Sequence, residues 1–230
     1  MEKGLQRKGI ARRNKMLHVA IQLFLQNGYE KTTTASIAKG AGMTPSSFFA
    51  AFENKEALLL ILVKVMFNKQ FESVGQFSGV SEDPVLLYSV ETALQIYIAE
   101  LSEPLRDIYV MAYSLPSTSE YIYANMAPRL QKLFSQYLPE AELKDFYEMD
   151  IASAGIMRAY MAKKCDLYFT IENKLTRFLQ SSLTIYSVPK QVQSQITDCI
   201  LKMDLQAYAE QIIQKMVELT EAGIPLILEE

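Results

Sequence analysis

Apolar residues recur every three or four positions along almost the whole chain, and strict alternation of apolar and polar residues is almost absent. Spacing of this kind gathers apolar side chains on one face of an α-helix. The pattern therefore predicts an all-α fold. The predicted helices lie near residues 10–27, 34–41, 45–52, 55–75, 84–101, 104–114, 117–137, 141–168, 170–187 and 190–221.

Glycine and proline mark where these helices begin and end. Most prolines fall at predicted helix starts, where the first helical turn tolerates them. Pro128 falls inside a predicted helix instead, so we expect it to kink or split that helix. Residues 75–83 form the clearest loop, and residues 1–9 look like a flexible arm. The helices predicted at 141–168 and 170–187 are also open to being one long helix.

The stretch SIAKGAGMTPSSFFAAFENKEAL, residues 36–58, breaks a helix and restarts it. Thr33 or Thr34 is suited to cap a first short helix, and Gly42 supplies the left-handed residue that ends it. Thr44 is a good N-cap for a second short helix with Pro45 at its first position. Two short helices joined by a tight glycine turn are the layout of a helix-turn-helix.

The second short helix has two different sides. Phe48 and Phe52 are four residues apart, so they share the side that packs on the first short helix. The opposite side carries Pro45, Ser46, Phe49 and Ala50. A face that lies against base edges in the major groove cannot carry carboxylates, and this one carries none.

The charge distribution is uneven along the chain. Residues 1–70 hold 11 Lys and Arg but 4 Asp and Glu, whereas the whole chain has a net charge of −3. A basic N-terminal part on an acidic remainder favours a polyanionic partner for that part. The first 20 residues lack the apolar run of a signal peptide, and no stretch has the length of a membrane span. We therefore expect a soluble, cytoplasmic protein that does not insert into a membrane.

The run from Met16 to Leu58 resembles the DNA-binding region of the tetracycline-repressor (TetR) family. That family has an apolar A..LF...G helix, then TT...IA..AG, a short recognition helix with an aromatic residue, and KE.L. Here the run reads AIQLFLQNGYEKTTTASIAKGAGMTPSSFFAAFENKEAL. The resemblance implies a helix-turn-helix domain at 1–55, a connector helix near 55–75, and an effector-binding and dimerisation domain at 76–230.

The resemblance also implies which residues meet DNA. The base-facing or phosphate-facing positions are Thr33, Thr44, Pro45, Ser46, Ser47, Phe49, Ala50 and Lys55, and the basic N-terminal segment adds Arg12 and Arg13. Two positions depart from the family. Phe49 stands where a Tyr hydroxyl usually reaches phosphate, and Ala50 where a His is common. Contact with thymine methyl groups can partly replace those bonds. Packing of Phe49 within its own domain, and a solvated basic arm, remain the alternatives.

The remainder of the chain lacks catalytic patterns. The single histidine of the whole chain lies in the N-terminal part, outside this remainder. No phosphate-binding glycine loop, dinucleotide motif or HExxH occurs. Cys165 and Cys199 are far apart, which suits reduced, buried thiols better than a disulfide or a metal site. We therefore expect no enzyme activity, no cofactor and no metal.

Tyrosine and methionine are concentrated in the predicted middle helices. Tyr combines an apolar body with a polar end, and Met fills irregular space, so both suit a pocket for a flat or greasy molecule. The candidate ligand-binding residues are Tyr97, Tyr109, Tyr113, Tyr123, Met126, Met157, Arg158 and Met161. Each also suits an ordinary place in a helical core. Arg158 is open to binding an acidic ligand group or to facing water.

The last predicted helices are amphipathic with wide apolar stripes. A pair of such helices can meet its two-fold copy as a four-helix bundle, and TetR-like proteins dimerise in this way. The candidate interface residues are Leu175, Phe178, Leu179, Leu183, Ile196, Met203, Tyr208 and Ile212. Packing within one chain is the alternative.

Together these features predict a homodimeric, sequence-specific transcriptional regulator, a repressor that a small apolar or aromatic effector releases from a near-palindromic operator. Two recognition helices would occupy successive major grooves. Two alternatives stay open. One is a DNA-binding dimer without a small effector, of an architectural or protein-responsive kind. The other, more remote, is a helical-bundle enzyme.

Overall fold

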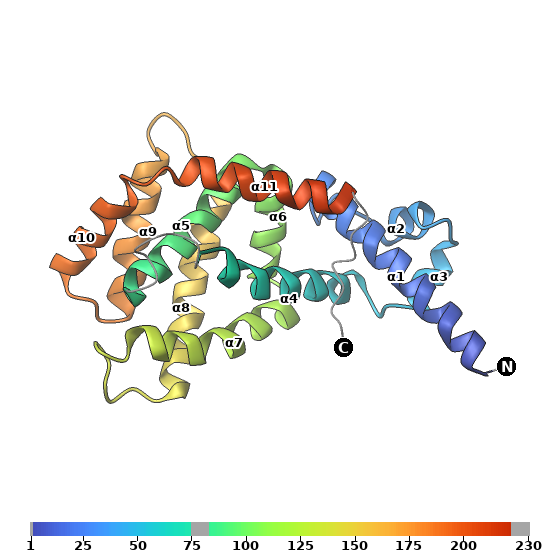
Figure 1. Ribbon diagram of the computed structural model, residues 1–230, viewed down its shortest axis with the longest axis horizontal. Coiled ribbons are helices and arrows are strands. Elements are labelled where there is room, and N and C mark those ends of the chain that lie inside the picture. Colours follow the sequence, from blue (N-terminus) through green and yellow to red (C-terminus); the bar gives the residue numbers. More distant parts are fainter. Residues whose placement is uncertain (1, 75–82, 222–230) are drawn as a thin grey trace.

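The computed structural model describes residues 2–74 and 83–221 of the chain, with side chains described at 9–67 and 83–218. Every regular element in these residues is a helix, which confirms the predicted all-α fold (Figure 1). In chain order the helices are α1 (Glu2–Asn27), α2 (Thr34–Gly40), α3 (Pro45–Phe49), α4 (Lys55–Val74), α5 (Pro84–Leu101), α6 (Glu103–Ala112), α7 (Pro116–Phe134), α8 (Leu143–Ala162), α9 (Ile171–Ile185), α10 (Lys190–Ile200) and α11 (Leu205–Glu221).

Several predicted helix boundaries were wrong. The segment predicted as a flexible arm is helical, because α1 already begins at Glu2. The region predicted as one helix at 190–221 is two helices, and Asp204 begins the second by accepting the backbone N–H of Ala207 at 3.2 Å. Pro128 does not split α7. The predicted loop at 75–83 lies almost wholly outside the described residues.

The helices α8 and α9 are separate rather than one long helix. Between them Asp166 accepts backbone N–H groups from Tyr168 and Phe169, both at 2.9 Å. Thr170 then caps α9 by accepting the N–H of Asn173. A side chain that satisfies backbone donors outside a helix competes with helix continuation, so this segment forms a turn.

The three N-terminal helices form a small unit, which we call the head, at one end of the molecule (Figure 1). Its core holds Met16, Phe24, Ile37 and Phe48, each at most 1% exposed. Since these residues come from all three helices, their burial fixes α2 and α3 against α1. The helix α4 then leads from the head into the rest of the fold.

Helices α5 to α11 form a second unit, which we call the body. The helix α5 lies at its centre and packs against α6, α8, α9, α10 and α11. Most of its residues are buried on every side, which is why it lacks a polar face of ordinary width. The long helix α11 runs along α5 and reaches α1 of the head (Figure 1).

A buried lysine joins α9 to α5. Lys174 is 1% exposed and its ammonium group donates to Glu100 Oε2 at 2.7 Å and to the carbonyl of Lys163. The backbone N–H of Cys165 also donates to the Glu100 carboxylate. A buried charge needs such partners to avoid a large desolvation cost. This cluster therefore holds the turn after α8 onto the end of α5.

The head meets the body through side chains on α6 and α7. Asp107 on α6 accepts the backbone N–H of Glu30, in the turn after α1, at 2.8 Å. Glu56 at the start of α4 accepts both the backbone N–H and the hydroxyl of Ser117 at the start of α7. These bonds tie the turn after α1 to α6 and the start of α4 to α7.

Gly28 allows the closest of these approaches. Its φ is +84°, a left-handed conformation, and a Cβ at this position would lie 2.7 Å from Oδ2 of Asp107. We expect Gly28→Ala to lower the free energy of unfolding by about 1–3 kcal/mol, since strain and a collision act together. Thermal unfolding followed by circular dichroism measures the loss.

Gly9→Ala is the matched control, because Gly9 lies in α1 with no atom near its Cβ position. We expect it to unfold at the same temperature or slightly higher. Equal melting temperatures for Gly28→Ala and the unsubstituted protein would show that the turn does not constrain the head.

Candidate functional site

The turn between α2 and α3 has the geometry of a helix-turn-helix. Thr33 caps α2 in a reciprocal capping box with Ser36, and Gly42 has a φ of +71°. Thr44 occupies the N-cap position of α3, but its hydroxyl contacts those of Ser46 and Ser47 instead of a backbone N–H. The predicted starts of both helices and the glycine turn are therefore confirmed. The second helix ends at Phe49 rather than at the predicted residue 52, and the predicted side-chain cap from Thr44 is absent.

The short helix α3 turns its two sides as the sequence predicts. Phe48 is fully buried and packs on Phe52, while Phe49 is 64% exposed. Pro45, Ser46 and Ala50 are exposed beside it, and Ser47 is half-buried. Phe49 contacts Phe48 edge to face, which holds the exposed ring in place. The outer side of α3 is thus an uncharged surface with one projecting aromatic ring.

The basic candidates in the head differ in what they contact. Arg12 and Arg13 are exposed on α1, and the Arg13 guanidinium lies over the Phe52 ring. Lys55 is half-buried instead. Its ammonium group donates to the carbonyls of Tyr29 and Thr32, at 2.8 and 2.9 Å, and burial lowers its pKa. Lys55 therefore fastens α4 to the turn after α1, and a phosphate contact by this residue remains a prediction.

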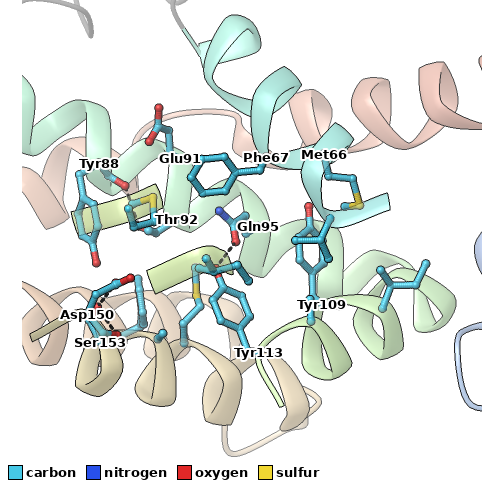
Figure 2. Close-up of a pocket in the computed structure, with 18 residues that line it drawn as sticks. Met66, Phe67, Tyr88, Glu91, Thr92, Gln95, Tyr109, Tyr113, Asp150 and Ser153 are labelled. Atoms are coloured by element: carbon cyan, nitrogen blue, oxygen red, sulfur yellow. Dashed lines mark hydrogen bonds between the residues drawn. The ribbon is translucent and has the colours of Figure 1, made fainter. Parts of the chain in front are cut away.

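The body contains a cavity between α4, α5, α6, α7, α8 and α9 (Figure 2). The space between its lining residues that no atom fills, including the part that is open to solvent, is about 780 Å³. The apolar part of the lining comprises Val63, Met66, Phe67, Ile108, Ala112, Ile122, Met126, Ala154, Met157 and Phe178, and the polar part comprises Tyr88, Glu91, Thr92, Gln95, Tyr109, Tyr113, Asp150 and Ser153. An apolar lining with a few placed polar groups is typical of a small-molecule site.

Several of the polar lining groups are held by hydrogen bonds to one another or to residues outside the lining. The Tyr113 hydroxyl donates to Gln95 Oε1 at 3.3 Å, which Figure 2 shows across the middle of the cavity. The Tyr88 hydroxyl shares a hydrogen bond with Ser182. Arg129 on α7 donates to Glu91 and forms a salt bridge with it. Burial raises the pKa of Glu91, and Arg129 opposes that rise.

Asp150 is the second buried carboxylate of the cavity, at 5% exposure. Ser153 donates to its Oδ1 at 3.0 Å, and the Ser153 oxygen is 2.7 Å from the Tyr186 hydroxyl. Its Oδ2 is buried without a hydrogen-bond partner. Burial raises the pKa of Asp150 to about 7, against the opposing effect of its hydrogen bonds. Near neutral pH the group is therefore divided between its ionised and protonated forms.

Residues 16–62 match the family of bacterial regulatory proteins named for TetR, and these residues hold the helix-turn-helix just described. This match makes the head a TetR-family DNA-binding domain. The relatives that the chain matches are HTH-type transcriptional regulators, which agrees with the sequence prediction of a regulator. The fold is accordingly a TetR-like helix-turn-helix followed by a helical C-terminal domain.

Relatives in this family share a modest part of the sequence. The chain is 29% identical over 106 residues to the uncharacterized HTH-type transcriptional regulator YuxN of Bacillus subtilis, which covers 46% of this chain and 36% of YuxN. It is 25% identical over 129 residues to the HTH-type transcriptional regulator QacR of Staphylococcus aureus, covering 55% of this chain and 64% of QacR. The matched region therefore spans less than two thirds of each relative.

A solved structure shares the fold more completely. The chain superimposes on RolR, crystallised in complex with the ligand resorcinol, with a TM-score of 0.66. The superposition covers 84% of this chain and 95% of RolR, at 15% sequence identity. At that identity the likeness shows a common fold for the TetR-like head and body together.

The predicted ligand-binding residues divide into two groups in this TetR-like body. Tyr109, Tyr113, Met126 and Met157 line the cavity. The other four do not. Tyr97 is half-buried on α5, Tyr123 packs edge to face on Tyr147, Arg158 is exposed on α8, and Met161 is buried in the core. Arg158 thus lies outside the cavity lining, in agreement with the alternative prediction that it faces water.

Sequence reasoning missed the polar side of the cavity. Glu91, Thr92 and Gln95 lie on α5 with Tyr88, at spacings of three and four, within an otherwise apolar helix. Such spacing places them on one face. The helix as a whole is too apolar to lie at the surface, so a line of polar residues along one of its faces indicates a buried polar site. This pattern was the sequence signal for these residues. Asp150 and Ser153 show the same spacing on α8.

The predicted dimer residues on α9 need correction. Leu175, Phe178, Leu179 and Leu183 are at most 1% exposed within a single chain, because they form the contact of α9 with α5 and α8. They are therefore core residues and do not form a surface for a partner. Ile196 is also buried. Met203 and Ile212 are half-buried and Tyr208 is 43% exposed, so these three are the predicted residues that retain some accessible surface.

Other classes of site find no support in the described residues. No group of His, Cys, Asp and Glu side chains there is arranged to hold a metal ion. Both cysteines are free thiols, each half-buried. No helix within the described part of the chain is long and apolar enough to cross a membrane.

The raised pKa of Asp150 makes the stability of the body depend on pH. A carboxyl with a higher pKa in the folded state binds its proton more tightly there, so its destabilising effect grows as pH rises toward 7. The free energy of unfolding of Asp150→Asn is compared with that of the unsubstituted protein. We expect this difference to be about 2–3 kcal/mol more favourable to the variant at pH 8 than at pH 5. Urea unfolding at both pH values measures this difference.

Glu148→Gln is the control for this measurement, since Glu148 is an exposed carboxylate on the same helix. Its unfolding free energy relative to the unsubstituted protein should not change with pH. An Asp150→Asn difference that is equally constant would mean that Asp150 is ionised in the folded protein throughout this range.

Proposed function

We propose that this TetR-family protein is a homodimeric transcriptional repressor that a small, largely apolar or aromatic effector releases from a near-palindromic operator. The observation that carries the proposal is the combination of two sites in one chain. The head presents an uncharged recognition surface on α3, and the body encloses a cavity lined by aromatic and polar groups. The resorcinol bound to RolR, a protein of the same fold, supports an aromatic effector here.

The contact between α6 and the head gives a physical route between the two sites. Tyr109 and Tyr113 of α6 line the cavity, and Asp107 on the same helix holds the turn that follows α1. A ligand that moves α6 therefore shifts the attachment of the head. The affinities for DNA and for effector are then coupled, by about 1–3 kcal/mol in typical cases.

A DNA-binding dimer without a small effector is the second candidate. A dry and filled body core would favour it. The cavity has one buried polar atom without a hydrogen-bond partner, Oδ2 of Asp150, and this favours the ligand-responsive function.

The proposed dimer has a candidate surface on α8. Its outward side carries Ile151, Ala152, Arg158, Ala159 and Ala162 as exposed residues, and Gly155 there has open space at its Cβ position. Small side chains let two helices approach closely, and a two-fold axis would bring the same surface of each chain together. A dimer is needed because a single short recognition helix buries too little surface for specific binding.

DNA binding is tested first with the unsubstituted protein. Fluorescence anisotropy compares DNA from the upstream intergenic region of its own gene with scrambled DNA, over a series of salt concentrations. We expect tight specific binding, a steep loss of affinity with salt, and two protomers per site. Equal affinity for both DNAs at every salt concentration would contradict recognition of that region.

The exposed ring on α3 makes a sharper test. We expect Phe49→Ala to weaken specific binding by about tenfold or more, through lost contact with bases, and to leave scrambled-DNA binding nearly unchanged. Leu143→Ala removes a comparably exposed apolar side chain from the body and should bind like the unsubstituted protein. An unchanged operator affinity for Phe49→Ala would mean that the ring only packs within the head.

The α8 surface is tested by charge. Ile151→Asp places a carboxylate at an exposed apolar position, so we expect monomers and a loss of specific DNA binding, with thermal unfolding little changed. Analytical ultracentrifugation measures the mass. Leu201→Asp, between α10 and α11, is the control and should remain dimeric. A dimeric Ile151→Asp variant would place the interface elsewhere.

A further inference from the structure

The cavity contains one carboxylate whose charge has no partner in the described structure. Asp150 is 5% exposed, and its Oδ1 is bonded to Ser153 while its Oδ2 is buried and unbonded. A buried polar atom without a partner costs free energy comparable to a lost hydrogen bond, and more when it is charged. Because Asp150 lines the cavity, a ligand there can supply what the fold does not.

The groups around Asp150 are all neutral near pH 7. Tyr88 on α5, Tyr113 after α6 and Tyr186 after α9 are the titratable groups that interact with it, and each has its pKa raised above the ordinary value by burial. Only the hydrogen bonds of Ser153 and Tyr186 favour the ionised form of Asp150. No basic side chain contributes to its pKa.

The other acid of the cavity already has its cation. Glu91 forms a salt bridge with Arg129, so this pair adds no net charge to the lining. Figure 2 shows Glu91 and Asp150 on separate sides of the cavity. When Asp150 is ionised, the lining as a whole therefore carries one unneutralised negative charge, in surroundings that are otherwise largely aromatic and apolar.

We propose that the effector of this protein is an aromatic cation, with a protonated nitrogen that binds the Asp150 carboxylate and a flat apolar body that packs among the tyrosine and methionine side chains. The proposal rests on the proposed function and names the chemical class of its effector. A protonated nitrogen gives Oδ2 a hydrogen-bond donor and neutralises the buried charge. The faces of aromatic rings also attract cations.

The same electrostatics exclude an acidic effector. A carboxylate ligand would place a second negative charge near Asp150, and like charges at close range are strongly unfavourable in a buried site. A neutral alcohol can donate to Oδ2 but leaves the charge of Asp150 without compensation. Among ligands that share the same aromatic body, the ammonium compound should therefore bind most tightly, the alcohol less tightly and the carboxylate least tightly.

Binding of the cation should depend on pH with a definite sign. The ionised form of Asp150 is the form that attracts it, and the pKa of this group is about 7. Affinity for an ammonium ligand should thus fall by about tenfold from pH 8 to pH 6, as the carboxylate becomes protonated. Binding of the amine to Asp150→Asn over the same pH range is the control for any change in Glu91, because this variant keeps Glu91 and the charged probe.

Three probes of one size test the proposal: naphthylmethylamine, naphthylmethanol and naphthoate. Isothermal titration calorimetry at pH 8 and pH 6 gives each affinity for the full-length protein, and naphthalene fluorescence gives a second measurement because the chain has no tryptophan. We expect the amine to bind about tenfold or more tightly than the alcohol at pH 8, and naphthoate not to bind.

Two variants assign the effect to Asp150. Asp150→Asn should remove most of the preference for the amine and its pH dependence, and should change binding of the alcohol little. Glu148→Gln removes an exposed carboxylate from the same helix and should keep the full preference. If Asp150→Asn does not fold, the pH series of the unsubstituted protein decides between the outcomes, because it needs no variant.

The outcomes separate this inference from the proposed function. An alcohol or carboxylate that binds as tightly as the amine, or an amine that binds Asp150→Asn as tightly, overturns the inference. If such a probe also releases the operator in the anisotropy assay, the ligand-responsive repressor stands. Binding of the amine that depends on Asp150 but does not affect DNA affinity supports the inference and contradicts the repressor mechanism. A lack of saturable binding by all three probes overturns both.

Discussion

A carboxylate buried in a helical bundle needs a cation, hydrogen-bond donors or a proton, and this requirement organises the body of the protein. Glu100 near the end of α5 receives the ammonium group of Lys174 from α9. Glu91, in the middle of α5, receives the guanidinium group of Arg129 from α7. Each pair holds a neighbouring helix to the central one at a defined position. Asp150 has the hydroxyl groups of Ser153 and Tyr186 beside it but no cation, which makes it the exception among the three.

This contrast separates structural from functional buried charge. Removing one partner of either salt bridge would leave an isolated charge in the core, so the stability of the fold depends on both partners. Asp150 already bears part of that cost, since Oδ2 is unbonded and the pKa of the group is raised to about 7. A group kept in an unfavourable state inside a cavity is more readily explained by what it binds than by what it stabilises.

The head was predictable from sequence because its signals are local. Gly42, the Thr33 cap and the Phe48–Phe52 pair lie within a few residues of the structure they determine. The body depends on contacts between distant helices. An apolar stripe on α9 indicated a buried face but did not distinguish burial against α5 from burial against a second chain. Leu175 and Phe178 were therefore assigned to a dimer although they fill the core.

The same difference explains why only part of the cavity was found. Tyr109, Tyr113, Met126 and Met157 stood out by residue type, whereas Glu91 and Asp150 required knowing which helices are buried on all sides.

The helix α6 gives a second connection between the two units, beside the connector helix α4. Tyr109 and Tyr113 line the cavity. Asp107, which is nearer the N-terminus of α6, accepts a hydrogen bond from the backbone N–H of Glu30. Gly28 leaves no room for a side chain beside Asp107, so the head cannot move relative to α6 without breaking that bond. A rigid contact of this kind transmits small displacements, because a packed interface has few intermediate positions. Under the proposed function, a ligand in the cavity beside α6 would therefore change the position of the head.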